Sequence, residues 1–298
     1  MTTHPWLWAV FTLVAAAAQT VRNATQRGLT SQLGTVGATH VRFLFGLPFA
    51  LLFLVGVAAI SGARLPQPEL DFWPWVLAGA LMQIAATALM LAAMGERSFV
   101  VVYAYIKTEP VQVALFGLIF LGDHVSPAMA FAIVIATAGV VLMSVRGGGT
   151  FAQRKPTVLG LAAGACFALS AIGYRGAILG LHDPNYVMAA TYTVVVGLAV
   201  QTVLLTIYLI ARDRAVLVAI FRAWRPSLVA GFMGALASQF WFLGFATATA
   251  ASVRTLALVE VLFAQAISRF VFKQPTSARE GFGIALIVAG VGLLIWAY

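Results

Sequence analysis

The stretch Arg146-Gly-Gly-Gly-Thr-Phe-Ala-Gln-Arg-Lys-Pro156 divides the chain almost in half. Its run of glycines, its basic residues and its proline make it the most linker-like segment of the 298 residues. On either side of it the sequence alternates between long apolar runs and short polar gaps. We therefore predict one unit at 1–146, a linker at 147–156 and a second unit at 157–298.

The composition is typical of a membrane protein. Hydrophobic residues make up 62% of the chain and charged residues 9%, and the mean hydropathy is +0.97. Soluble proteins carry about 25% charged residues. A β-barrel, the alternative to helices in lipid, needs apolar and polar residues in alternation, and runs such as 49–60 and 130–141 do not alternate. An all-α polytopic membrane protein is therefore predicted.

The apolar stretches are long enough to cross a bilayer as helices. A helix needs about 20 apolar residues to span the hydrocarbon core, so ten crossings with short connections fill the chain. The predicted spans are 5–26, 35–60, 72–95, 98–121, 127–145, 157–179, 186–211, 226–246, 249–272 and 275–297. The single Cys166 provides neither a disulfide framework nor a cysteine-based metal site, and we predict no metal and no cofactor.

Basic residues are distributed unevenly between the connections. The formal net charge is +9. The odd-numbered connections hold eleven basic residues: Arg27, Arg97, Arg146, Arg154, Lys155, Arg212, Arg214, Arg222, Arg225, Lys273 and Arg279. Only Arg64 falls clearly in an even-numbered connection. Because basic loops stay in the cytoplasm, this bias predicts that both termini lie outside. It also accounts for the net charge without a nucleic-acid partner.

The two halves are predicted to repeat one another. Five spans lie on each side of the linker, and an odd number of crossings per half means that two copies of one fold insert in opposite orientations. Sliding the chain by 151 residues places Glu109 on Glu260 and Gly139 on Gly290. These matches predict two inverted five-helix repeats around a central cavity.

Two stretches of the first half carry a resemblance to a known family. Residues 108–111 (Thr-Glu-Pro-Val) lead to 120–123 (Phe-Leu-Gly-Asp), and 138–142 (Ala-Gly-Val-Val-Leu) follow. They resemble the repeat ending of the EamA branch of the drug/metabolite transporter superfamily, in which a proline-containing fourth helix runs through a Gly-Glu turn into a glycine-bearing fifth helix. The resemblance implies ten helices in two five-helix repeats over nearly the whole chain.

The resemblance also implies a function, the export of small metabolites, with amino-acid exporters of the YddG kind as the first comparison. It implies cytoplasmic termini, in conflict with the distribution of basic residues. Asp123 replaces the usual Glu of the family. In the second half Val261 stands in place of the proline, and Lys273 with Gln274 in place of the Gly-Glu turn. Whether the ninth span is kinked like the fourth is therefore left open.

Apart from Arg279 and Glu280 at the start of the last span, eight charged residues fall inside the predicted spans, where a charge at the helix centre costs about 2.5–3.5 kcal/mol. They are Arg22, Arg42, Lys107, Arg175, Arg254, Arg269, Glu109 and Glu260. Arg42, Arg175 and Arg269 lie close to span ends, from which an arginine can reach the interface by snorkelling. We favour a structural role for these three.

Lys107 and Glu109 lie near the middle of the fourth span, directly before Pro110. Proline lacks an N–H group and kinks a helix, so a freed carbonyl and two charges are predicted to face a polar cavity. Tyr103 shares a helix face with Lys107, and Tyr105 shares one with Glu109. We predict that these residues contribute to the substrate path.

Further polar residues in the spans complete the predicted cavity. They are Gln19, Asn23, Gln83, Tyr174, Gln239, Trp241, Arg254 and Glu260. The alternative is structural, since polar contacts between membrane helices contribute about 0.6 kcal/mol on average, and Glu109 could pair with a cation such as Arg22 merely to lock helices together. The two glutamates could also bind protons in a coupled cycle.

These features predict a secondary transporter that works by alternating access. The chain has no phosphate-binding GxxxxGK[ST] motif, so ATP is not the expected driving force. The expected substrate is a small metabolite, first an amino acid, with a hydrophobic cation as the alternative. An enzyme is disfavoured because HExxH and GxSxG motifs are absent, and a channel is a third possibility. We expect a bacterial inner-membrane protein for which a monomer suffices, with a dimer left open.

Overall fold

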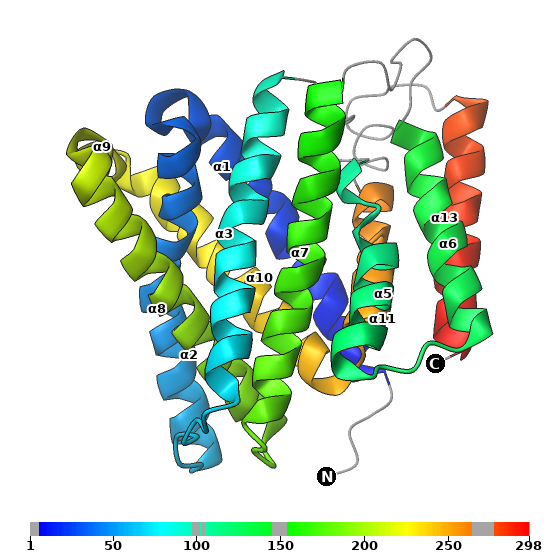
Figure 1. Cartoon of the computed structure of the whole chain (residues 1–298), viewed down its shortest axis with the longest axis horizontal. Helices are drawn as coiled ribbons and strands as arrows, with labels where there is room; N and C mark the ends of the chain where they lie inside the picture. The colour runs from blue at the N-terminus through cyan, green and yellow to red at the C-terminus, as the bar shows by residue number, and fades with distance from the viewer. Residues whose placement is uncertain (1–5, 97–101, 103–104, 145–153, 264–276, 298) are drawn as a thin grey trace.

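The computed structural model describes residues 6–96, 102, 105–144, 154–263 and 277–297, and in this part of the chain the regular structure is helical throughout (Figure 1). The helices are α1 (Leu7–Leu44), α2 (Gly46–Ser61), α3 (Phe72–Glu96), α5 (Glu109–Leu121), α6 (Pro127–Ser144), α7 (Arg154–Gly180), α8 (Tyr186–Arg212), α9 (Arg214–Arg222), α10 (Trp224–Thr247), α11 (Ala250–Leu256) and α13 (Ala278–Ala297). Six helical stretches are long and apolar enough to cross a membrane, with Leu7–Ser61 counted as one.

Most of the described helices coincide with predicted spans. Six of them, α3, α6, α7, α8, α10 and α13, begin and end within a few residues of the prediction. A backbone in lipid must form its hydrogen bonds within the helix, so uninterrupted apolar runs define the helix ends closely. The predicted spans 98–121 and 249–272 are described only in part, by α5, α11 and short adjoining segments.

The predicted connection at 27–34 is shorter in the structure. The first part of α1 stays helical through 27–33, and the helix is broken at Gly34, whose φ of 66° and ψ of 177° lie outside the helical region, so that α1 consists of two helices joined at this residue. Leu29 and Leu33 are buried and extend the core-facing side of the helix. The Gln26 side chain crosses the bend and donates from Nε2 to the carbonyl oxygen of Ala38 at 2.8 Å. The polar gap in the sequence is therefore the polar end of a long helix.

Another difference is α9, which lies in a segment predicted to be a connection. Ile220 is fully buried, whereas Arg214 and Arg222 on the same helix are exposed. Asp213 begins the helix by accepting a hydrogen bond from the backbone N–H of Val216 at 3.3 Å. With 9 residues it is too short to span a bilayer, and it lies at one end of the bundle (Figure 1).

The most extensive helix contacts join the two halves of the chain. α1 packs on α10, α3 on α7 and α6 on α13, with further contacts between α2 and α8 and between α5 and α11. In Figure 1 the α6–α13 pair stands at one side of the molecule. Close approach depends on glycine: a Cβ atom at Gly173 of α7 would lie 2.7 Å from the backbone nitrogen of Gly79 in α3.

Substitution of Gly173 tests this packing. We expect Gly173→Ala to lower the stability of the protein by about 1–3 kcal/mol, because the new methyl group overlaps backbone atoms that cannot rotate away. Gly56→Ala in α2 is the matched control, since a Cβ there meets nothing within 4 Å. Thermal unfolding of the detergent-solubilised proteins measures both effects. Equal melting temperatures for the two variants would contradict the α3–α7 contact.

Candidate functional site

α5 and α11 meet inside the bundle, and the chain is interrupted beside each of them (Figure 1). It turns at 107–108 before α5 begins at Glu109, and again at 257–258 after α11 ends. Pro110 occupies the first turn of α5, where its missing N–H is not required. Interrupted helices occur at membrane depth only where the freed backbone groups are buried in protein or line a cavity. The crossing of α5 and α11 is therefore a candidate site.

The interruption after α11 forms without a proline, which resolves the question that Val261 left open. The backbone N–H groups of Leu258 and Glu260 donate to carbonyls three residues earlier, at 3.0 and 3.1 Å. Such bonds tighten the chain into 3₁₀-type turns. The chain thus breaks at corresponding places in the two halves, just before Glu109 and just before Glu260.

Each of these glutamates forms an ion pair with a basic residue of the other half. Glu260 pairs with Lys107, and Oε1 of Glu109 lies 3.1 Å from Nε of Arg254. The four residues are only 2–8% exposed. Arg254 is thus a cation in direct contact with Glu109, and Arg22, which the sequence suggested, lines the same cavity. Removing one member of a buried pair is costly because the other charge then stays in a medium of low dielectric constant.

A cavity of about 20 Å³ lies at this crossing. Its lining residues are Gln19, Arg22, Asn23, Met90, Ile106, Lys107, Glu109, Phe167 and Arg254. This volume admits roughly one water molecule, whereas pockets for small molecules measure about 300–1,000 Å³. Among the described residues this cavity is too small for a metabolite, so binding of a substrate there requires the surrounding helices to separate.

Aromatic and amide groups hold the cations of this site. The guanidinium of Arg254 lies 4.3 Å from the ring centroid of Trp241, within the range of a cation–π interaction. Nε1 of Trp241 donates to Oε1 of Gln19 at 3.1 Å. Nη2 of Arg22 donates to Oδ1 of Asn23 at 2.6 Å. These contacts bring α1, α10 and α11 together at the cavity.

Two of the predicted cavity residues belong to a separate buried network. Nε2 of Gln201 in α8 donates to Oε1 of Gln83 at 2.8 Å and to the hydroxyl of Tyr174 at 2.9 Å. The Tyr174 hydroxyl donates to Oε1 of Gln83 at 3.2 Å. This network joins α3, α7 and α8. Gln201 was not predicted, although an amide within the apolar span 186–211 is a signal that could have identified it.

Two other predicted residues, Gln239 and Tyr105, are not among the residues that line the cavity. Nε2 of Gln239 donates to Oγ1 of Thr191 at 2.7 Å, on the side of α10 that faces α8. Tyr105 packs closely against Gly160 of α7, where a Cβ atom would lie 2.7 Å from that of the tyrosine. Tyr103 lies outside the described residues.

Arg42 is not a snorkelling residue, contrary to the sequence-based prediction. It is 2% exposed and lies at the break between α1 and α2. Its Nη1 donates to Oγ1 of Thr87 at 3.4 Å. Gly234 of α10 leaves room for it, since a Cβ there would lie 3.1 Å from Cγ of Arg42. The bend of α1 and this glycine turn the side chain inward. Arg269 lies outside the described residues.

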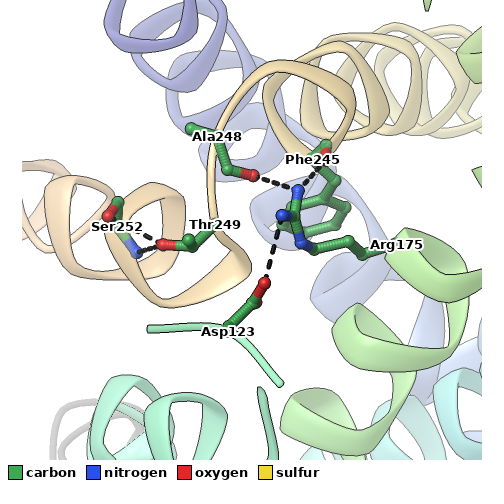
Figure 2. A network of polar contacts seen from close by, with 6 residues as sticks. All are labelled: Asp123, Arg175, Phe245, Ala248, Thr249 and Ser252. Carbon is green, nitrogen blue, oxygen red and sulfur yellow. Dashed lines mark hydrogen bonds and ion pairs between the residues drawn. The ribbon is translucent and has the colours of Figure 1, made fainter. Parts of the chain in front are cut away.

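Arg175 also points inward, and it joins three segments near the end of the bundle where α1 begins and α13 ends (Figures 1 and 2). Nη1 donates to the carbonyl oxygens of Phe245 and Ala248 at 2.6 and 2.5 Å, and Nη2 donates to Oδ1 of Asp123 at 3.2 Å. The arginine thereby caps the C-terminal end of α10 and ties α7 to the connection after α5. We call this set of contacts the Arg175 clasp.

Comparisons with known proteins gave one family match and one similar solved structure. Residues 6–145 match the sequence profile of the EamA-like transporter family. A crystal structure of a protein 18% identical in sequence has the same fold, with a TM-score of 0.69 over 97% of this chain and 99% of the other. No curated protein sequence matches the chain. The family match supports the resemblance seen at 108–142 but does not select a particular exporter within the family.

Proposed function

We propose that the protein exports small metabolites by alternating access, because residues 6–145 match the EamA-like transporter family, within the drug/metabolite transporter superfamily. The family match supports a multi-pass membrane transporter of a small molecule rather than an enzyme. Amino acids and related compounds are the first substrates to examine. A bacterial inner membrane is the proposed location.

The observation that carries the proposal is the pair of ion pairs at the crossing of α5 and α11. Buried charges in a membrane protein usually mark a substrate or ion path. Glu109–Arg254 and Lys107–Glu260 each join one half of the chain to the other. A motion that separates the halves must break both pairs, and the substrate or a proton would then replace the lost partner.

The pairing of the helices supports an inverted repeat of the two halves, and with it alternating access. Under the 151-residue shift the pairing of α1 with α10 corresponds to that of α7 with α3, and these are two of the three most extensive helix contacts. The pairs α2–α8 and α6–α13 each map onto themselves. Rocking of such halves about a fixed central site opens it to one side and then to the other.

The Arg175 clasp is the proposed closure on the side of the termini. It lies beyond the central cavity and joins segments of both halves. By the distribution of basic residues, this side faces outward. Opening toward it requires the Asp123–Arg175 ion pair to break.

Asp123→Asn tests this closure. We expect the variant to favour opening toward the termini by about 1–2 kcal/mol, or about five- to thirty-fold, because Arg175 loses a charged partner. The measurement is the rate at which a polar thiol reagent, added from that side, labels a cysteine at Met90 in a Cys166→Ala background. Asp183→Asn, on the same side and outside the clasp, is the control. Unchanged labelling in Asp123→Asn would rule out the clasp as a gate.

Transport itself is tested with purified protein in liposomes. Saturable uptake and counterflow of a labelled amino-acid panel, with and without a pH gradient, are the expected results. Dependence on the gradient, lost in Glu109→Gln or Glu260→Gln, would support protons as the coupling ion. Flux that neither saturates nor exchanges would point to a channel, and no flux of any small metabolite would refute the proposed function.

A further inference from the structure

We propose that the transported substrate carries a net negative charge and that its carboxylate or phosphate binds among Arg22, Arg42, Lys107 and Arg254, here called the cationic cluster. This inference rests on the proposed function and narrows its substrate class to small organic anions. It follows from the balance of charge inside the bundle.

The cationic cluster outnumbers the carboxylates beside it. Its four members are 2–8% exposed, and only Glu109 and Glu260, at 5% and 2%, are buried with them. Each glutamate is already in an ion pair with one member of the cluster. Four cations and two carboxylates leave two positive charges in excess at the centre of an apolar bundle.

The remaining acidic residues do not correct this imbalance. They lie in connections or at helix ends: Glu69, Asp71, Glu96, Asp123, Asp183, Asp213 and Glu280. Asp123 belongs to the Arg175 clasp, and the Glu280 carboxylate accepts a hydrogen bond from the backbone N–H of Ser277 at the start of α13. The stretches outside the described residues contain no Asp or Glu, so they cannot supply a further carboxylate.

Two members of the cationic cluster lie side by side. Arg22 and Arg42 both pack against Gly234, where a Cβ atom would lie 3.4 Å from Cδ of Arg22 and 3.1 Å from Cγ of Arg42. The positive charges of these two arginines act on each other, and like charges repel more strongly where water is excluded. A bound anion would offset the repulsion, whereas a hydrophobic cation would increase it.

The cavity also has the chemistry to hold an anion. Arg22, Lys107 and Arg254 line it together with the amides of Gln19 and Asn23. Guanidinium groups match carboxylate and phosphate geometry through two parallel hydrogen bonds, and such charge-assisted bonds are about twice as strong as neutral ones. When the helices separate, these groups are placed to compete for a negatively charged substrate.

Matched pairs of solutes test the proposal in liposomes. Glutamate against glutamine, and glycerol phosphate against glycerol, differ mainly in charge. We expect kcat/KM to be at least about tenfold higher for the anion in one pair. Equal or better transport of the neutral members would overturn the inference while leaving the proposed function intact. No saturable transport of any solute would overturn the proposed function, and this inference with it.

Arg42→Gln provides a second readout that does not depend on transport. Without ligand, its melting temperature should equal or exceed that of the wild type, because like-charge repulsion is relieved. The rise in melting temperature caused by the preferred anion should shrink. Arg225→Gln, at an exposed position, should behave as the wild type. If the anion raises the melting temperature of Arg42→Gln as much as that of the wild type, the anion does not bind at the cationic cluster.

Discussion

Replacing Arg254 with Gln is expected to lower the free energy of unfolding by about 3–5 kcal/mol, because the buried Glu109 loses the cation in direct contact with it. Glu109→Gln should also be destabilising, because the buried Arg254 then loses the carboxylate in direct contact with it. The double variant should recover much of the loss, since two neutral amides can bond to each other where the ion pair stood. Unfolding of all four proteins in one detergent gives the double-mutant cycle.

The coupling free energy from this cycle is the informative quantity. A pair in direct contact shows coupling of about 0.5–3 kcal/mol, whereas independent sites add within about 0.3–0.5 kcal/mol. Arg64→Gln, at an exposed position in the 62–71 connection, controls for the loss of a charge as such. Strict additivity of Glu109→Gln and Arg254→Gln would contradict the contact between α5 and α11.

Reversal of charge at Lys107 should have the larger effect. Lys107→Glu would place a third carboxylate beside Glu109 and Glu260, and like charges in contact cost several kcal/mol. We expect almost no folded protein, measured as the monodisperse fraction of a fluorescent fusion after detergent extraction. The exchanged pair Lys107→Glu/Glu260→Lys restores opposite charges and should restore much of the folded fraction.

The control for this reversal is Glu69→Lys, which changes charge at an exposed position and should alter stability by less than about 0.5 kcal/mol. If Lys107→Glu gives as much folded protein as the wild type, position 107 is not buried among carboxylates. A low folded fraction of the exchanged pair could come from misfolding or from loss of the contact. The melting temperature of the folded fraction is therefore compared with that of the wild type.

The bounds of a helix could be predicted from the sequence where they depend only on the length of an apolar run. α8 at 186–212 lies within one residue of its prediction, because a long apolar run bounded by polar residues has few alternatives in lipid. The break of α1 at Gly34 falls at the end of the predicted connection 27–34, but the helical conformation of 27–33 could not be predicted, since it depends on contacts such as that of Gln26 with Ala38 across the break. The break before Glu260 likewise depends on local hydrogen bonding rather than on a proline.

The sequence could predict which charged residues form the candidate site, but not which of them form ion pairs with one another. Lys107, Glu109 and Arg254 stood out because charges are rare in apolar spans. Their partners depend on how helices from the two halves cross, which one-dimensional spacing does not contain. Arg42 shows the same limit: its place near a span end suggested the interface, and only the packing against Gly234 turns it inward.

The central claim is that the cavity at the crossing of α5 and α11 opens alternately to the two sides of the membrane and binds the substrate. The most direct test is thiol labelling of Met90→Cys in a Cys166→Ala background, with a polar reagent added to oriented vesicles from either side. Met90 lines the cavity, whereas Leu81→Cys on the same helix is exposed on the outside of the bundle and is the control. We predict labelling of Met90→Cys from both sides, slowed by transported substrate. Labelling from one side only, or at a rate that substrate does not change, would contradict the account.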